Sequence, residues 1–140
     1  MGYIDASEEH MWWCIAAALA EPGWVGRWQN ESGSELEVQA VADGQVTGRY
    51  RTDLGAPEET AWFPVTGSVN GDQVAFVVSW GTHGSLTAWV GQRIGDAEDE
   101  RLRTLWHLTR DVPDAQEEDD VWSSVISGFA VFRRVTPPAP

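Results

Sequence analysis

Short β-forming runs separated by turn residues at regular spacing constrain this chain more than any other feature. Beyond Trp24, stretches rich in Val, Thr, Trp, Tyr and Phe alternate with Gly, Asn and Asp, which is typical of an antiparallel meander. Asp43-Gly44 and Asn70-Gly71 are dipeptides that tolerate the positive φ of two-residue hairpin turns. Glu31-Ser32-Gly33 is comparably short. These joints predict that strands adjacent in sequence pair antiparallel.

The pattern predicts eight strands in one domain. The second strand shows period-2 alternation, with Leu36, Val38 and Ala40 on the side facing the core. Eight antiparallel strands tend to close, because closure removes exposed edges and leaves an interior wide enough for side chains plus one small ligand. We therefore predict an all-β, eight-stranded antiparallel up-and-down barrel, with a two-sheet sandwich as the alternative. The expected strands are Val25–Asn30, Ser34–Ala42, Gln45–Thr52, Ala61–Val69, Gln73–Gly81, Ser85–Ile94, Arg101–Arg110 and Val121–Val135.

Two segments flank the barrel. Residues 1–23 are rich in helix formers and end at Pro22-Gly23, which predicts a short N-terminal helical arm. Residues 24–135 form the barrel, and residues 136–140 form a Pro-rich tail that is expected to be extended. Because exposed adjacent tryptophans favour aggregation, Met11-Trp12-Trp13-Cys14 is expected to pack on the barrel or on a neighbouring chain.

Charge and cysteine content argue against several classes of function. The formal net charge is −13, so the long-range field repels phosphate backbones and nucleic acid is not an expected partner. Cys14 is the single cysteine, which rules out an intramolecular disulfide and a cysteine-based metal site. His83 and His107 have no second ligand at suitable spacing, so no metal is expected. No convincing triad or carboxylate pair indicates an enzyme, and an enzyme on a lipocalin-like barrel is the least favoured alternative.

The first twenty residues give little support for a membrane span or a signal peptide. The apolar run Met11 to Ala20 is too short to cross a bilayer. Ala18-Leu19-Ala20 resembles a cleavage site, but acidic residues precede the run where a secretory signal carries basic ones. No membrane partner is therefore expected.

Several motifs occur in the order found in one known family. The segment Gly26-Arg27-Trp28-Gln29-Asn30-Glu31-Ser32-Gly33-Ser34 resembles the first-hairpin motif of the avidin and streptavidin family, Gly-X-Trp-X-Asn-X-X-Gly-Ser. The likeness extends to Val135 and is closer to the streptavidin branch. It implies a barrel that holds biotin non-enzymatically at its open end, in a homo-oligomer (a tetramer or larger) that is secreted or periplasmic. The other matching segments are Gly48-Arg49-Tyr50, Trp80, Thr87-Ala88-Trp89-Val90-Gly91-Gln92, Leu105-Trp106-His107-Leu108-Thr109, Trp122, Gly128 and Phe132.

The resemblance assigns polar side chains to the ureido ring, which is costly to bury unless each polar atom finds a partner. Asn30, Ser34 and Tyr50 would converge on the ureido oxygen, since all three can donate a hydrogen bond. Thr52 would accept one ureido N–H. Thr87 would approach the thioether sulfur of the ligand. Ser85 and the backbone N–H of Ala56 would bind the carboxylate of the ligand.

The resemblance also assigns apolar walls to the site. Trp80, Trp89 and Trp106 would line the apolar half, and rigid rings of this kind lose little entropy when a ligand binds. Trp122 would complete the pocket of a neighbouring subunit. Further wall residues would be Leu54, Phe76 and Leu108.

Two positions depart from the family pattern. Ala130 stands where family members carry an aspartate or asparagine that accepts the second ureido N–H, and Ser32 stands where the streptavidin motif has leucine. An unpaired N–H in a dry site costs about 1–3 kcal/mol, or roughly 5- to 150-fold in affinity, unless water substitutes. We therefore expect high-affinity biotin binding to be weakened. The alternative is that the same barrel binds a different small ligand, such as a biotin analogue, a peptide or a hydrophobic metabolite.

Overall fold

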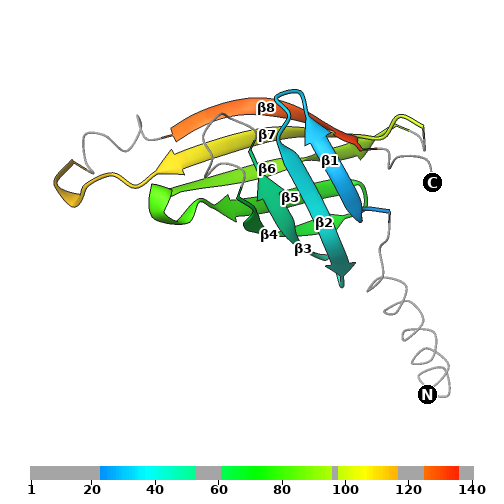
Figure 1. Cartoon of the computed structure of the whole chain (residues 1–140), viewed down its shortest axis with the longest axis horizontal. Helices are drawn as coiled ribbons and strands as arrows, with labels where there is room; N and C mark the ends of the chain where they lie inside the picture. Colours follow the sequence, from blue (N-terminus) through cyan, green and yellow to red (C-terminus); the bar gives the residue numbers. More distant parts are fainter. Residues whose placement is uncertain (1–22, 53–60, 96–97, 117–124, 136–140) are drawn as a thin grey trace, which may run out of the picture.

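The computed structural model is a closed barrel of eight strands (Figure 1). It describes residues 23–52, 61–95, 98–116 and 125–135. Each strand pairs antiparallel with the next, and β8 pairs with β1. The predicted up-and-down barrel is confirmed, and the alternative of a two-sheet sandwich is wrong. The strands are β1 (Gly26–Asn30), β2 (Glu35–Ala42), β3 (Gln45–Arg51), β4 (Phe63–Asn70), β5 (Gln73–Ser79), β6 (Ser85–Ile94), β7 (Arg101–Arg110) and β8 (Val125–Arg134).

The observed strand bounds agree closely with those expected from the sequence. Two single 3₁₀ turns, η2 (Gly81–His83) and η3 (Asp114–Gln116), lie in the connections after β5 and β7. The predicted helical arm, the Pro-rich tail and the first residues of the predicted last strand lie outside the described residues. Within the described ranges, no helix is long and apolar enough to cross a membrane.

Turn chemistry sets the register of the hairpins. Asp43 and Gly44 have φ of 54° and 73°, the left-handed pair that a two-residue turn between twisted strands requires. Gly71 has φ of 59° and plays the same part in the hairpin between β4 and β5. Both predicted tight turns are therefore present.

Strand β2 departs from the simple alternation expected of it. Leu36 and Val38 are buried as predicted, but Ala40 is exposed and Val41 is buried in its place. The pairing register with β3 shifts between Val38 and Ala40. Such a β-bulge inserts one residue and reverses which faces are buried beyond it, so the prediction for Ala40 is wrong.

One end of the barrel is sealed by aromatic rings and arginines. Trp24 and Trp28 are buried there, and the Trp28 indole Nε1 donates to the Trp24 carbonyl at 3.1 Å. The Arg134 guanidinium lies 4.2 Å above the Trp28 ring, and Arg93 lies 4.6 Å above the Trp24 ring. This packing leaves the opposite end of the barrel as the place for a ligand site.

Candidate functional site

The strand order brings the predicted site residues to the end of the barrel opposite the sealed one, which we call the site end. Its rim consists of the connections from β1 to β2, β3 to β4, β5 to β6 and β7 to β8. Side chains from the strand residues nearest these connections alternate inward and outward. The described residues predicted to bind ligand lie between the middles of the strands and these connections: Asn30, Ser34, Tyr50, Thr52, Phe76, Trp80, Ser85, Thr87, Trp89, Trp106, Leu108 and Ala130. The remaining three, Leu54, Ala56 and Trp122, lie outside the described residues.

Asn30 uses one half of its amide to hold the first turn and leaves the other half for the interior. Its Oδ1 accepts the backbone N–H groups of Ser32 and Ser34, both at 3.0 Å. An amide oxygen engaged in this way fixes the orientation of the side chain, so that the Nδ2 donor points away from the turn.

The side chains of Asn30 and Ser34 lie beside the Tyr50 hydroxyl. Their side-chain hydrogen bonding lowers the pKa of that hydroxyl, and both Ser34 and Tyr50 are buried. Three elements therefore place three groups that can donate a hydrogen bond within reach of one another. A carbonyl oxygen is the ligand group that suits such a cluster.

Burial raises the pKa of Tyr50 to about 12; hydrogen bonds from Ser34 and Asn30 oppose the rise, whereas the charge of Glu31 adds to it. The hydroxyl therefore stays protonated, and able to donate, through neutral and mildly alkaline pH.

The raised pKa of Tyr50 predicts a pH dependence of stability. Its folded-state pKa lies above the unfolded value near 10, so its contribution to the free energy of unfolding is complete below pH 10 and is lost as pH rises toward 12. We expect the loss to reach about 2 kcal/mol, measured by urea unfolding at a series of pH values. Tyr50→Phe should flatten the profile over this range. If the free energy of unfolding of the parental protein does not change between pH 10 and pH 12, the pKa of the Tyr50 hydroxyl is not raised by folding.

Aromatic rings form a wall that adjoins the donor cluster. The Trp80 Nε1 donates to the Thr87 hydroxyl at 2.8 Å, which fixes the indole. The Trp80 ring meets the Tyr50 ring edge-on with centroids 5.8 Å apart. The Trp89 ring lies 4.8 Å from the Tyr50 ring and stacks on Phe76 at 4.7 Å. Phe76 therefore supports Trp89 from the core side.

The pairing register brings the last two strands into the same wall. Trp106 lies opposite Trp89 on β6 and opposite Gly128 on β8. Ala130 is buried two residues further along β8. Thr52, Ser85 and Leu108 are partly exposed near the rim.

Comparisons with known proteins agree with this geometry. Residues 21–135 match the sequence pattern of the Avidin family. The chain belongs to the avidin family. Xenavidin is 30% identical in sequence to this chain, and its structure matches with a TM-score of 0.69. The match covers 97% of the xenavidin chain and 80% of this one. The rhizavidin–biotin complex is 26% identical with a TM-score of 0.66, covering 94% of that chain and 81% of this one. Apo shwanavidin is also 26% identical with a TM-score of 0.66, covering 97% of that chain and 79% of this one.

Sequence reasoning missed two side chains at the site end of this avidin-family barrel. Phe63 begins β4 and meets the Trp80 ring edge-on at 5.0 Å, and its position two residues before buried Val65 could have indicated an inward orientation. Thr104 is buried on β7 directly opposite Ala130. Its hydroxyl donates to the Ala130 carbonyl oxygen at 2.9 Å.

Gly128 makes room for the Trp106 indole. A Cβ atom at residue 128 would lie 2.6 Å from Cζ2 of Trp106, so any side chain must displace the ring. We expect Gly128→Ala to lower the free energy of unfolding by about 1–3 kcal/mol through overpacking, measured by chemical denaturation. Ser127→Ala, at an exposed neighbouring position, is the matched control, and equal stability of the two variants would contradict this packing.

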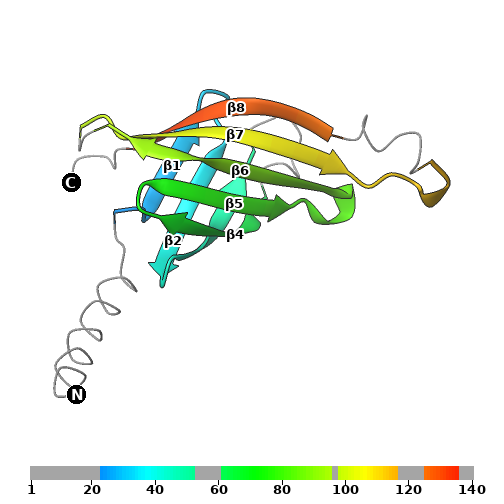
Figure 2. The ribbon, with the colours of Figure 1, turned by 180° about the vertical axis from the view of Figure 1, so that it is seen from behind.

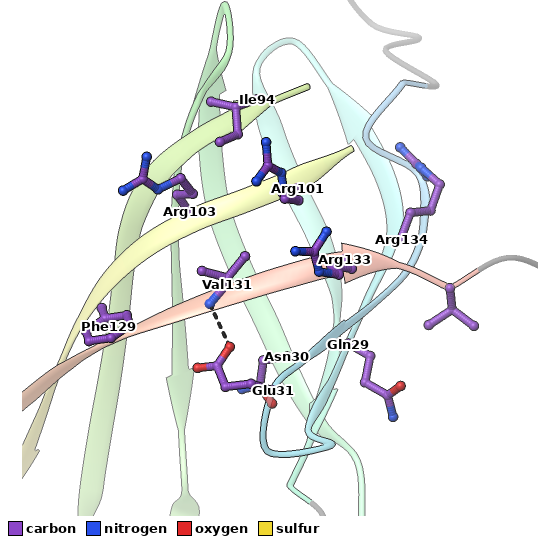
Figure 3. A pocket seen from close by; sticks show the side chains of 11 residues that line it. Gln29, Asn30, Glu31, Ile94, Arg101, Arg103, Phe129, Val131, Arg133 and Arg134 are labelled. Carbon is purple, nitrogen blue, oxygen red and sulfur yellow. Dashed lines mark hydrogen bonds between the residues drawn. The ribbon is translucent and has the colours of Figure 1, made fainter. Parts of the chain in front are cut away.

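The hollow shown in Figure 3 is not this site. It has a volume of about 630 Å³ and lies on the outer surface where β7, β8 and β1 meet. Four arginines line it: Arg101, Arg103, Arg133 and Arg134. Within the described ranges, no three His, Cys, Asp or Glu side chains come together in an arrangement suited to a metal ion.

Proposed function

We propose that this avidin-family protein binds biotin, without reacting with it, at the site end of the barrel. The observation that carries the proposal is the meeting of the Asn30, Ser34 and Tyr50 side chains around one hydroxyl, beside fixed indoles. A ureido carbonyl accepts from such donors, and the indole wall suits the apolar remainder of the ligand. Rhizavidin, a relative by structure, was solved in complex with biotin.

The remaining roles are proposed on the family resemblance. Thr52 would accept one ureido N–H, Thr87 would approach the thioether sulfur, and Ser85 with the Ala56 N–H would hold the carboxylate. Trp80, Trp89 and Trp106 would enclose the ring system, with Leu54 and Leu108 as further wall. Ala130 offers no acceptor for the second ureido N–H, so we propose an affinity lowered by roughly 5- to 150-fold relative to a barrel that supplies one.

Calorimetric titration with biotin at known subunit concentration tests the proposal. The expected result is one biotin per chain, with a negative heat-capacity change because apolar surface is buried. A titration that shows no heat and no binding at millimolar biotin would overturn it.

We also propose that the chain forms a homo-oligomer through the outer surface of β6, β7 and β8, strands that lie side by side in Figure 2. We call this outer surface the apolar face. It carries three exposed apolar side chains: Phe129 is 73% exposed, Leu105 is 64% exposed and Val90 is 59% exposed. Contiguous exposed apolar patches of this kind mark interaction sites. A second copy of the chain is the partner that the family resemblance favours, with Trp122 completing its pocket.

The opposite outer surface is built differently. On β1, β2 and β3, Glu35 pairs with Arg27 and, at 3.2 Å, with Arg51, while Glu37 pairs with Arg49 at 3.1 Å. Charged side chains already paired within the subunit suit a solvent-facing surface. The contrast favours β6 to β8 as the contact surface.

Export to the periplasm or medium is proposed on the family resemblance alone. Recovery of the protein in those fractions of the producing cell would support it, and retention in the cytoplasmic fraction would contradict it.

A further inference from the structure

The inner surface of the site end has two unlike sides. The side formed by β1, β2 and β3 carries the donor cluster and the Thr52 hydroxyl. The side formed by β7 and β8 presents Trp106, Leu108, Gly128 and Ala130, none of which has a side-chain hydrogen-bond acceptor. A ligand head group held here therefore meets polar partners along one edge and carbon along the other.

The one polar side chain below this apolar side is already engaged. Thr104 lies opposite Ala130 in the β7–β8 pairing, is buried, and donates its hydroxyl hydrogen to the Ala130 carbonyl at 2.9 Å. That bond holds the hydroxyl against the β8 backbone beside Ala130. Because a hydroxyl that donates keeps two acceptor lone pairs, Thr104→Val tests whether its oxygen also accepts from a ligand. We expect an unchanged affinity for biotin, and a loss of more than about 10-fold would overturn the proposal below.

Ala130 lies close to the donor cluster. Asn30 pairs with Phe132, and Ala130 is the next inward-facing residue along β8 toward the rim. Glu31 ties the first turn to the same strand, because its Oε2 accepts the Val131 N–H at 3.0 Å (Figure 3). A carbonyl held by Asn30 would consequently have one flanking atom directed toward Ala130.

We propose that the site end selects ligands in which the carbonyl is flanked by a single N–H: lactams, cyclic carbamates and ureas alkylated on one nitrogen. This inference rests on the proposed biotin-like binding mode and names its ligand class more narrowly. A cyclic urea carries two N–H groups, and the second would face the Ala130 methyl without a partner. Replacing that N–H by carbon or oxygen removes the penalty.

Biotin and its two mono-N-methyl isomers, titrated separately, test the proposal. We expect one isomer to bind at least as tightly as biotin, up to roughly 150-fold tighter, because its methyl group faces Ala130. The other isomer should bind at least about 10-fold more weakly, because it loses the bond to Thr52. Two isomers that both bind more than about 10-fold more weakly than biotin, or two that both match it, would overturn the proposal.

Ala130→Asp provides the complementary test. Restoring an acceptor should tighten biotin binding by roughly 5- to 150-fold and weaken the tolerated isomer by at least about 10-fold. Thr47→Asp makes the same charge change at an exposed position on β3, outside the proposed subunit contact, and should alter neither affinity. Absence of biotin binding in every variant would instead defeat the proposed function itself, whereas biotin binding with the wrong isomer pattern defeats only the single N–H selectivity.

Discussion

Asn30→Asp is expected to weaken biotin binding by at least about 100-fold at neutral pH while leaving the barrel folded. The substitution keeps the shape of the side chain and the oxygen that accepts from the Ser32 and Ser34 backbone N–H groups, both at 3.0 Å. The substitution replaces the Asn30 amide nitrogen by a second carboxylate oxygen. A donor directed toward the ligand carbonyl becomes a charged acceptor, so one hydrogen bond is lost and a repulsion is added.

Stability should change little in this variant. The turn from β1 to β2 depends on the retained oxygen, and hydrogen bonds from backbone N–H groups to a carboxylate are stronger than those to an amide oxygen. We expect the free energy of unfolding to stay within about 1 kcal/mol of the parental value. Biotin titration and chemical denaturation on the same preparation separate the two effects.

The matched control is Gln45→Glu, which adds the same charge at an exposed position on β3 away from the first turn. It should leave the affinity for biotin within about 3-fold, because its charge is screened by solvent. If Asn30→Asp binds biotin as tightly as the control does, the Asn30 amide does not donate to the ligand and the donor cluster has another purpose.

Local sequence signals were sufficient for the strands and turns of this barrel but not for its irregularities. The turn at Asp43-Gly44 and the alternation of apolar residues along a strand are determined by a few neighbouring residues, so both could be predicted from the sequence. The bulge at Ala40 depends on how β2 meets β3, and an alanine is compatible with either face. Glu35 alternates with the inward-facing Leu36 and is nevertheless buried, because Arg27 and Arg51 approach it from the two neighbouring strands.

The candidate site shows the same division between local and long-range causes. The motif around Asn30 and Ser34 could be found in the sequence, yet each residue alone is compatible with an ordinary turn. Their meeting with Tyr50 follows from the β2–β3 register, which places Tyr50 opposite Leu36. Phe63 and the engagement of Thr104 were missed because both depend on partners that are distant in the sequence, Trp80 and Ala130.

Leu105→Glu is expected to break the proposed oligomer, raising the Kd of self-association by roughly 1,000-fold or more. Leu105 pairs with Val90 on one side and with Phe129 on the other, so it lies at the centre of the apolar face. A carboxylate there would be buried without a partner, at a cost of several kcal/mol. In a two-fold symmetric contact each substitution appears twice, which doubles the cost.

Sedimentation or light scattering over a range of concentrations measures this effect, with Leu105→Arg and Thr47→Glu as companion variants. Because apolar neighbours offer a partner to neither sign of charge, Leu105→Arg should dissociate the assembly as Leu105→Glu does. Thr47, exposed on β3, lies outside the apolar face, so Thr47→Glu should keep the parental mass. A parental mass in both Leu105 variants, or a monomeric parent at every concentration, would contradict the interface. Circular dichroism that matches the parent in all variants would show that any loss of mass arises from the contact and not from unfolding.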